Sequence, residues 1–170
     1  LRLAAPVAAL PGQRFILRGF AKLDGRGATL AGGRVLSIAS PRRRRGRPEV
    51  VEQLKVLAGA DAGARVAALL AMAGPAGLGV EALSGRAAMS PRAAEEAVQR
   101  LGARGGALLV DRERRTWVAG PVAEALAARL VAAVEAHHRR EPLAAGMGKE
   151  ALRGVLPPVA DARLFARLLT

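Results

Sequence analysis

The glycine-rich stretch at residues 6–38 constrains the fold most, because its composition departs from the helical pattern of the rest of the chain. It holds two short apolar runs, at residues 15–17 and 35–38, which are typical of strands. Residues 1–3, with Val7, have the pattern of an earlier strand. We therefore expect an incomplete β-module with unpaired strand edges. The glycines that suit turns between its strands are Gly25, Gly27, Gly32 and Gly33.

Apolar residues recur at helical spacing from residue 49 onward. One helix is predicted between Pro48 and Gly59, and a second one ends at Gly74. Ser90 followed by Pro91 predicts the start of a further helix, because serine caps the first turn and proline suits its first position. The apolar faces of these three helices are Val50, Leu54 and Leu57; Val66, Leu69, Leu70 and Ala73; and Ala94, Ala97, Val98 and Leu101.

Residues 61–118 have the plan of a winged helix. A short helix is predicted at residues 80–83, between the two longer helices of this segment. Two strands are predicted at residues 107–110 and 116–118, on either side of a charged turn. Helices followed by a β-ribbon predict a helix-turn-helix with a wing, and Trp117 is expected to pack that wing onto its own helices.

The same order begins again in the last part of the chain. A long helix is predicted from Pro121 to the residue before Pro142, and a short helix at residues 149–155. A third helix follows Pro157 and Pro158. This repeat predicts a second winged helix, truncated where its wing is expected. The apolar faces of its long and third helices are Val122, Leu126, Leu130, Ala133, Val134 and His137, and Leu164, Phe165, Leu168 and Leu169.

The net charge of +13 is concentrated at the front of the chain. Residues 1–48 contain eleven Arg or Lys against one acid, whereas residues 49–170 contain sixteen against thirteen. A basic surface attracts polyanions, so nucleic acid is the first partner to consider and an anionic membrane the second. The like charges between Pro41 and Pro48 are typical of a linker, either a phosphate-facing tether or a solvated spacer. They are Arg42, Arg43, Arg44, Arg45 and Arg47.

Composition and spacing exclude several kinds of site. The chain has no cysteine, no apolar run of the roughly 18–20 residues that span a bilayer, and no signal-peptide pattern, so we expect a cytoplasmic protein with no membrane partner. Gly148 and Lys149 are followed by Glu150, whereas a phosphate-binding loop needs serine or threonine there. His137 and His138 point about 100° apart on a helix and cannot chelate one metal together. We expect no catalytic residue and no metal site.

Two runs near the front of the chain carry a resemblance to a known family. Residues 11–18 read PGQRFILR, and residues 29–36 read TLAGGRVL. They resemble the closing strands of the third domain of translational GTPases, in particular of the bacterial selenocysteine-specific elongation factors. Gln13 stands where that family has an acid, and Ala31 replaces the first of three glycines, so both departures concern the local turn.

Two runs near the end of the chain are similar to the second winged helix of the same family. They are HHRREPL at residues 137–143 and GMGKEALR at residues 146–153. The resemblance implies part of a translation factor that delivers selenocysteinyl-tRNA to the ribosome for selenocysteine incorporation. It also implies that the whole protein is a translational GTPase, with GTP and Mg²⁺ in a domain upstream and a reader of the selenoprotein mRNA hairpin downstream. No cofactor is expected within these residues.

We predict an electrostatic RNA-binding surface of low sequence specificity. Only 2% of the residues are aromatic, and those few lie in or beside apolar runs, so the stacking platforms of single-strand RNA readers are excluded. The barrel-end and linker candidates are Arg14, Arg18, Arg34, Arg42, Arg43, Arg44, Arg45 and Arg47. The wing candidates, which could equally be a solvated hairpin tip, are Arg112, Arg114 and Arg115.

A winged-helix DNA-binding transcriptional regulator is the second hypothesis. The exposed face of the helix that begins at Pro91 presents Arg92, Glu95, Glu96 and Gln99, with a net charge of −1. A helix in a major groove is flanked by phosphates and usually carries arginine and lysine. This face therefore argues against DNA binding.

Taken together, the patterns predict an α+β fold, mainly α, in which a partial β-barrel segment precedes tandem winged-helix domains. Residues 1–40 are predicted to be the end of the translational-GTPase third domain. Residues 41–60 are the basic linker and first helix, residues 61–118 the first winged helix, and residues 119–170 the second, truncated one.

Overall fold

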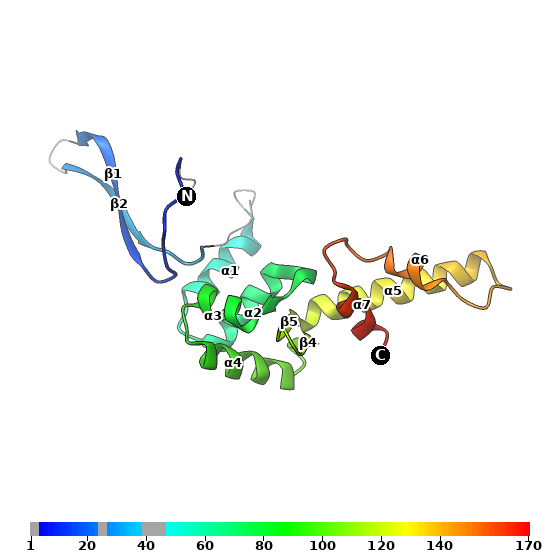
Figure 1. Ribbon diagram of the computed structural model, residues 1–170. Helices are drawn as coiled ribbons and strands as arrows, with labels where there is room; N and C mark the ends of the chain where they lie inside the picture. Colours follow the sequence, from blue (N-terminus) through cyan, green and yellow to red (C-terminus); the bar gives the residue numbers. More distant parts are fainter. Residues whose placement is uncertain (1–3, 24–26, 39–46) are drawn as a thin grey trace.

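The computed structural model describes residues 4–23, 27–38 and 47–170. Figure 1 shows an elongated arrangement, with a β-hairpin at one end, a group of packed helices in the middle, and a long helix leading to the other end. The described residues form one two-stranded and one three-stranded open sheet, and no closed barrel. The predicted fold class, α+β and mainly α, is confirmed.

The hairpin consists of β1 (Arg14–Leu23) and β2 (Gly27–Arg34), which pair in antiparallel fashion. The expectation of a strand at residues 35–38 was wrong, because β2 ends before that run and contains three of the glycines expected in turns, Gly27, Gly32 and Gly33. Gly25 lies outside the described residues. Phe15 lies opposite Gly33, and a Cβ on that glycine would be 2.6 Å from Cζ of the phenylalanine ring. Gly33 is thus a strand residue whose missing side chain makes room for Phe15.

The hairpin sheet is open, and much of its apolar surface is exposed. Ile16 is 70% exposed and Leu30 is 58% exposed. The strand expected at residues 1–3 lies outside the described residues, and Val7 lies in irregular structure. A two-stranded sheet cannot bury both of its faces by itself, which agrees with the expectation of a partial β-module.

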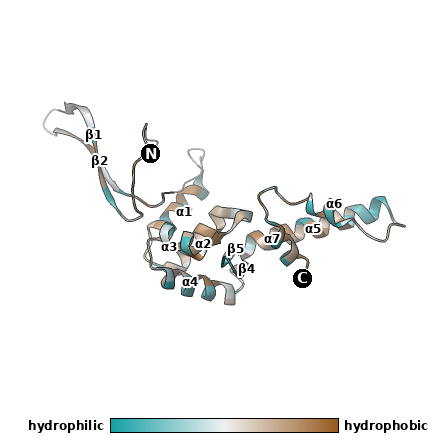
Figure 2. Cartoon of the chain, in the orientation of Figure 1, coloured by the Kyte–Doolittle hydropathy of each residue, from teal (hydrophilic) through white to brown (hydrophobic). Residues whose placement is uncertain are grey.

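Four helices follow the hairpin: α1 (Pro48–Ala58), α2 (Ala62–Ala73), α3 (Val80–Ala87) and α4 (Pro91–Ala103). The predicted starts and ends of α1 and α4, the end of α2 and the start of α3 agree with the structure, but α3 extends to Ala87, beyond the predicted residues 80–83. For example, Ser90 Oγ accepts a hydrogen bond from the amide of Ala93 at 3.2 Å, which caps the first turn of α4. In Figure 2, α2 is largely hydrophobic, whereas α4 carries hydrophilic residues along its length.

These helices enclose the first hydrophobic core. The predicted apolar faces supply most of it, and burying each large side chain stabilises the fold by about 1.5–3 kcal/mol. Its fully buried members include Val66, Leu70, Leu83, Ala94 and Val98.

The wing is a three-stranded antiparallel sheet in the order β3 (Leu78–Gly79), β5 (Thr116–Ala119), β4 (Ala107–Asp111). A short 3₁₀ turn, η1 (Gly74–Ala76), comes before β3. The sequence pattern missed β3, because two residues are too short to show an alternation. Trp117 packs against α4 as expected: a Cβ on Gly102 would lie 2.7 Å from its ring.

The last part of the chain comprises α5 (Gly120–Arg140), α6 (Lys149–Arg153) and α7 (Ala162–Leu168). It forms a second hydrophobic core on the outer face of the wing. Alternate residues of β4 and β5 point into different cores: Ala107 and Ala119 belong to the first core, whereas Val118 belongs to the second. Both faces of the wing are therefore covered by protein. The other members of the second core include Leu126, Leu130, Leu156, Leu164 and Phe165.

Candidate nucleic-acid interface

Three of the predicted RNA-binding arginines share one face of the β-hairpin. Arg14, Ile16 and Arg18 alternate along β1 and are exposed, whereas the residues between them are half-buried. Arg34 of β2 lies directly opposite Arg14, so its side chain emerges on the same face. We call Arg14, Arg18 and Arg34 the hairpin arginines.

The hairpin arginines lie on strands that carry no counter-charge. The described residues of the hairpin and the segment before it include no aspartate or glutamate. Like charges directly opposite each other on a sheet are destabilising, by up to about 1 kcal/mol. A bound polyanion would offset that repulsion by attracting both arginines. The hairpin face is therefore suited to hold phosphate groups.

Arg34 also has a structural contact. Its Nη2 donates a hydrogen bond to the main-chain oxygen of Ala58, 2.8 Å away, at the C-terminal end of α1. The free carbonyls at a helix C-terminus carry partial negative charge, so this contact is favourable. It ties the base of the hairpin to the first helix.

The linker arginines are only partly covered by the structure. Arg47 is exposed and immediately precedes α1. Arg42, Arg43, Arg44 and Arg45 lie outside the described residues. Their assignment to RNA binding stays a prediction from charge and composition.

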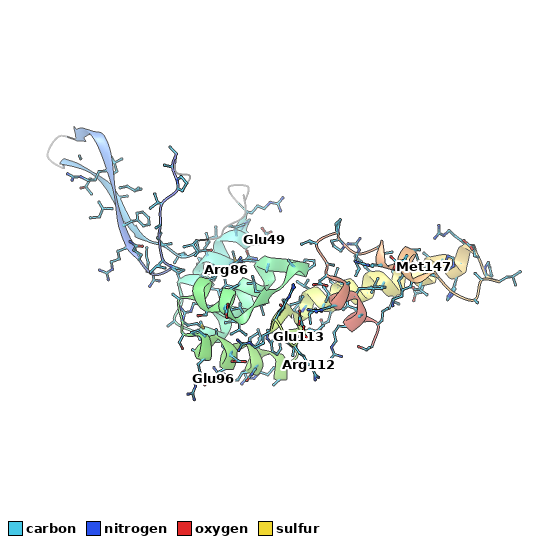
Figure 3. All side chains as sticks on the ribbon, in the orientation of Figure 1. Glu49, Arg86, Glu96, Arg112, Glu113 and Met147 are labelled. Carbon is cyan, nitrogen blue, oxygen red and sulfur yellow. The ribbon has the colours of Figure 1, made fainter. Side chains whose placement is uncertain are left out.

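The wing arginines differ from one another in their contacts. Arg115 is held by Glu95 of α4, with 3.1 Å between Nη1 and Oε2. Arg114 lies 4.0 Å from the carboxylate of Asp111, and both arginines expose about half or more of their side chains. Arg112 is exposed and has no ion pair among the described residues. Figure 3 shows Arg112 beside Glu113 at the tip of the wing.

Asp111 organises the turn of the wing and joins it to the second core. It is 6% exposed, and its Oδ1 accepts hydrogen bonds from the amides of Glu113 and Arg114 at 2.9 and 3.1 Å. Its other oxygen is paired with Arg163 of α7, and Arg163 also lies 3.6 Å from Glu113. The wing is thus fixed to α7, which leaves its tip, but not its strands, open to a ligand.

The exposed face of α4 is less acidic than the sequence stripe predicts. Glu96 lies 3.0 Å from Arg92 and 3.9 Å from Arg100, and Glu95 pairs with the wing. Arg100 and Arg115 thus join Arg92 beside the two glutamates, and this set has a net charge of +1 rather than −1. The expectation of a net negative surface was wrong, because the predicted stripe left out Arg100, one turn further along α4, and Arg115 of the wing. Both glutamates nevertheless remain beside any phosphate that would approach this face.

Residues distant in sequence account for what the pattern missed. Arg163 and Asp111 are 52 positions apart, and no local spacing indicates that they meet.

Across the described residues there is no group of three or more metal-binding side chains, and no helix there has the length and apolar character needed to cross a membrane. His137 is half-buried, and its Nε2 lies 3.2 Å from the main-chain oxygen of Gly146.

Two comparisons with known proteins agree with the resemblance indicated by the motifs. Residues 131–170 match the family described as "Elongation factor SelB, winged helix". The selenocysteine-specific elongation factor of Desulfomicrobium baculatum is 30% identical to this chain over 152 residues. That match covers 89% of this chain and 23% of the relative, so the chain spans less than a quarter of the length of the relative.

These matches confirm the resemblance to selenocysteine-specific elongation factors. The match covers 89% of the chain, so it is not confined to the helices. It gives no support to a DNA-binding regulator.

Proposed function

We propose that this chain is the part of a selenocysteine-specific elongation factor in which a basic hairpin and linker face transfer RNA and two winged helices form an arm. The arm leads toward a module that reads the selenoprotein mRNA hairpin. The proposal extends the function for which the relative is named to this part of the chain. It rests mainly on one observation. The hairpin has several basic residues and, among its described residues, no acid, and it precedes helices that match the SelB winged helix.

The whole protein would be a translational GTPase of the cytoplasm that delivers selenocysteinyl-tRNA to the ribosome. GTP and Mg²⁺ would bind in a domain outside these residues. We assign no catalytic residue, metal or cofactor to this chain itself. Its contribution would be positioning: it holds tRNA at the front by charge and extends the mRNA reader away from it.

The packing of the wing supports the role of an arm. The same sheet forms one wall of the first core and one wall of the second. The ion pair between Asp111 and Arg163 adds a polar contact across that junction. Two modules that share a sheet resist bending at their boundary more than modules joined by a free linker, so they suit a spacer of fixed length.

Salt dependence of tRNA affinity tests this proposal. In the first variant, Arg42, Arg43, Arg44, Arg45 and Arg47 are changed to alanine. We expect a lower affinity and a flatter dependence of log K on log salt, by up to about 0.7–0.9 for each phosphate that the variant no longer neutralises. Changing Arg92 and Gln99 to alanine on α4 should alter little, because Arg92 is already paired with Glu96, 3.0 Å away, and Gln99 carries no charge.

A matched control removes the same charge from the back of the chain. It changes five exposed arginines that lie outside the hairpin, linker and wing to alanine, and it should keep the slope of the unmodified chain. The residues are Arg104, Arg139, Arg140, Arg153 and Arg167. A helix variant that loses more affinity than the linker variant would contradict the proposal and restore the DNA-binding hypothesis.

A further inference from the structure

A small cavity lies at the junction between the base of the hairpin and the first winged helix. Its volume is about 50 Å³, and Arg34, Arg65 and Arg86 all line it. We call it the junction pocket. The three arginines come from β2, α2 and α3, so only the folded chain brings them together. In Figure 3, Arg86 lies on the hairpin side of the helices, away from Arg112 and Glu113 at the wing tip.

The junction pocket concentrates positive charge without an internal counter-charge. None of its described lining residues is an aspartate or a glutamate. Arg34 and Arg65 each donate one hydrogen bond to a helix-end carbonyl, of Ala58 at 2.8 Å and of Ala87 at 3.0 Å. Arg86 is half-buried and has no hydrogen-bond or ion-pair partner among the described residues. Three guanidinium groups in one cavity repel one another unless an anion lies between them.

Arg65 supplies a second observation that points to a ligand. Its Nε is buried and has no hydrogen-bond partner in the described part of the chain. A buried donor without a partner costs about 1–3 kcal/mol, and more when it is charged. Because Nη1 is used by Ala87, the free edge of the guanidinium is the one formed by Nε and Nη2. An edge of this kind can donate two parallel hydrogen bonds to the oxygens of a phosphate group once the side chain turns it toward the cavity.

The size of the cavity fits the same ligand. A cavity needs roughly 10–15 Å³ of such volume to hold one water-sized group, so about 50 Å³ holds three or four oxygens. Arg34 belongs both to the hairpin arginines and to the junction pocket. A nucleic-acid strand that follows the hairpin face is therefore led to the pocket.

We propose that the junction pocket binds a backbone phosphate of RNA through Arg65 and Arg86, with Arg34 as the link to the hairpin face. This inference rests on the proposed function and adds to it a contact in the winged helix, outside the hairpin and linker. The pocket fixes the register of the bound strand and carries no base specificity, because a phosphate group is the same at every nucleotide.

The first arm of the test is a salt titration of tRNA affinity with the whole 170-residue chain. Arg86→Gln should weaken binding several-fold and reduce the slope of log K against log salt by roughly 0.7–0.9, the value for one phosphate contact. Arg139→Gln removes the same charge at the far end of α5 and should leave the slope unchanged. Arg86→Lys keeps the charge and should keep most of the slope, provided that melting temperatures show all three variants folded.

The second arm follows the side-chain Nε–H signal of Arg65 by NMR. It should shift when a tRNA transcript is added to the unmodified chain, and the shift should disappear in Arg86→Gln. Inorganic phosphate is the comparison probe. A shift with inorganic phosphate but none with tRNA would overturn the proposal in favour of a small-anion site.

Failure of the pocket is distinguishable from failure of the proposed function. If tRNA binds and the linker variant flattens its salt dependence, but Arg86→Gln behaves as Arg139→Gln does, the pocket proposal is wrong and the proposed function stands. If the unmodified chain binds no tRNA, both are wrong.

Discussion

The glycines of this chain differ in how much space surrounds the position of a side chain. Gly120, the first residue of α5, is buried, and a methyl group on it would overlap the main-chain oxygen of Gly105. Gly85 lies inside α3, and a methyl group there would meet nothing within 4 Å. The two positions are both helical, yet only the first requires the absence of a side chain. Gly120 allows the long helix to start directly against the turn that ends α4.

We predict opposite effects of alanine at these two glycines. Gly120→Ala should destabilise the chain by about 1–3 kcal/mol, because the overlap forces the backbone of the turn to move. Gly85→Ala should stabilise it by about 0.4–1 kcal/mol, because alanine restricts the unfolded chain and favours the helix. Urea unfolding measures both. Equal free energies of unfolding for the two variants would contradict the close approach at Gly120.

At the scale of elements, the sequence predicts helices well because their ends are marked. Pro48, Ser90 and Pro91 lie at helix starts, and Gly59 and Gly74 at helix ends, as their residue types indicate. The second strand of the hairpin was misplaced for a physical reason. Glycines are typical of turns, but here Gly33 lies in a strand because the ring of Phe15 needs its space.

The candidate site was predictable as charge but not as geometry. Counting arginines locates the basic front, and strand alternation places Arg14 and Arg18 on one face. The junction pocket joins Arg34 to Arg65 and Arg86, which lie on three different elements. The periodicity within one element does not indicate which residues of other elements lie beside it. Arg65 and Arg86 were therefore not predicted as site residues.

The helix α7 should be the least protected of the buried elements in the helical part. It has seven residues, whereas an isolated helix needs roughly 12–15 to be even marginal, so it depends on its contacts with β4 and α5. Leu164 and Phe165 are buried, but Leu169 is 49% exposed. We predict faster amide exchange in α7 than in α2 and α4. Equal protection of the three helices would contradict this.

The ion pair between Asp111 and Arg163 allows the prediction of fast amide exchange in α7 to be tested with two variants. Arg163→Gln should speed amide exchange in α7 further, because it removes the polar contact that ties α7 to the wing. The free energy of unfolding should also fall, because Asp111 is only 6% exposed and would lose the cation that is paired with it. Arg167→Gln, on the same helix, removes only a hydrogen bond to Thr170 and should leave the exchange rates unchanged.

At the scale of the whole molecule, charge and packing divide the chain in two. The front carries most of the net charge and exposes apolar side chains on an open hairpin. The back has two hydrophobic cores on either side of one sheet and a nearly balanced charge. A basic front and a rigid back suit a part that holds RNA at one end and acts as a spacer at the other.

The most direct test of this division is a map of backbone amide NMR shifts of the 170-residue chain on addition of a tRNA transcript. We expect the largest shifts in residues 12–65, which hold the hairpin, the linker and the start of α2, with a second group around Arg86. The exposed face of α4 and all of α7 should remain unchanged. Largest shifts on α4, at residues 91–103, would contradict the account, because they would make the winged helix the reader of nucleic acid.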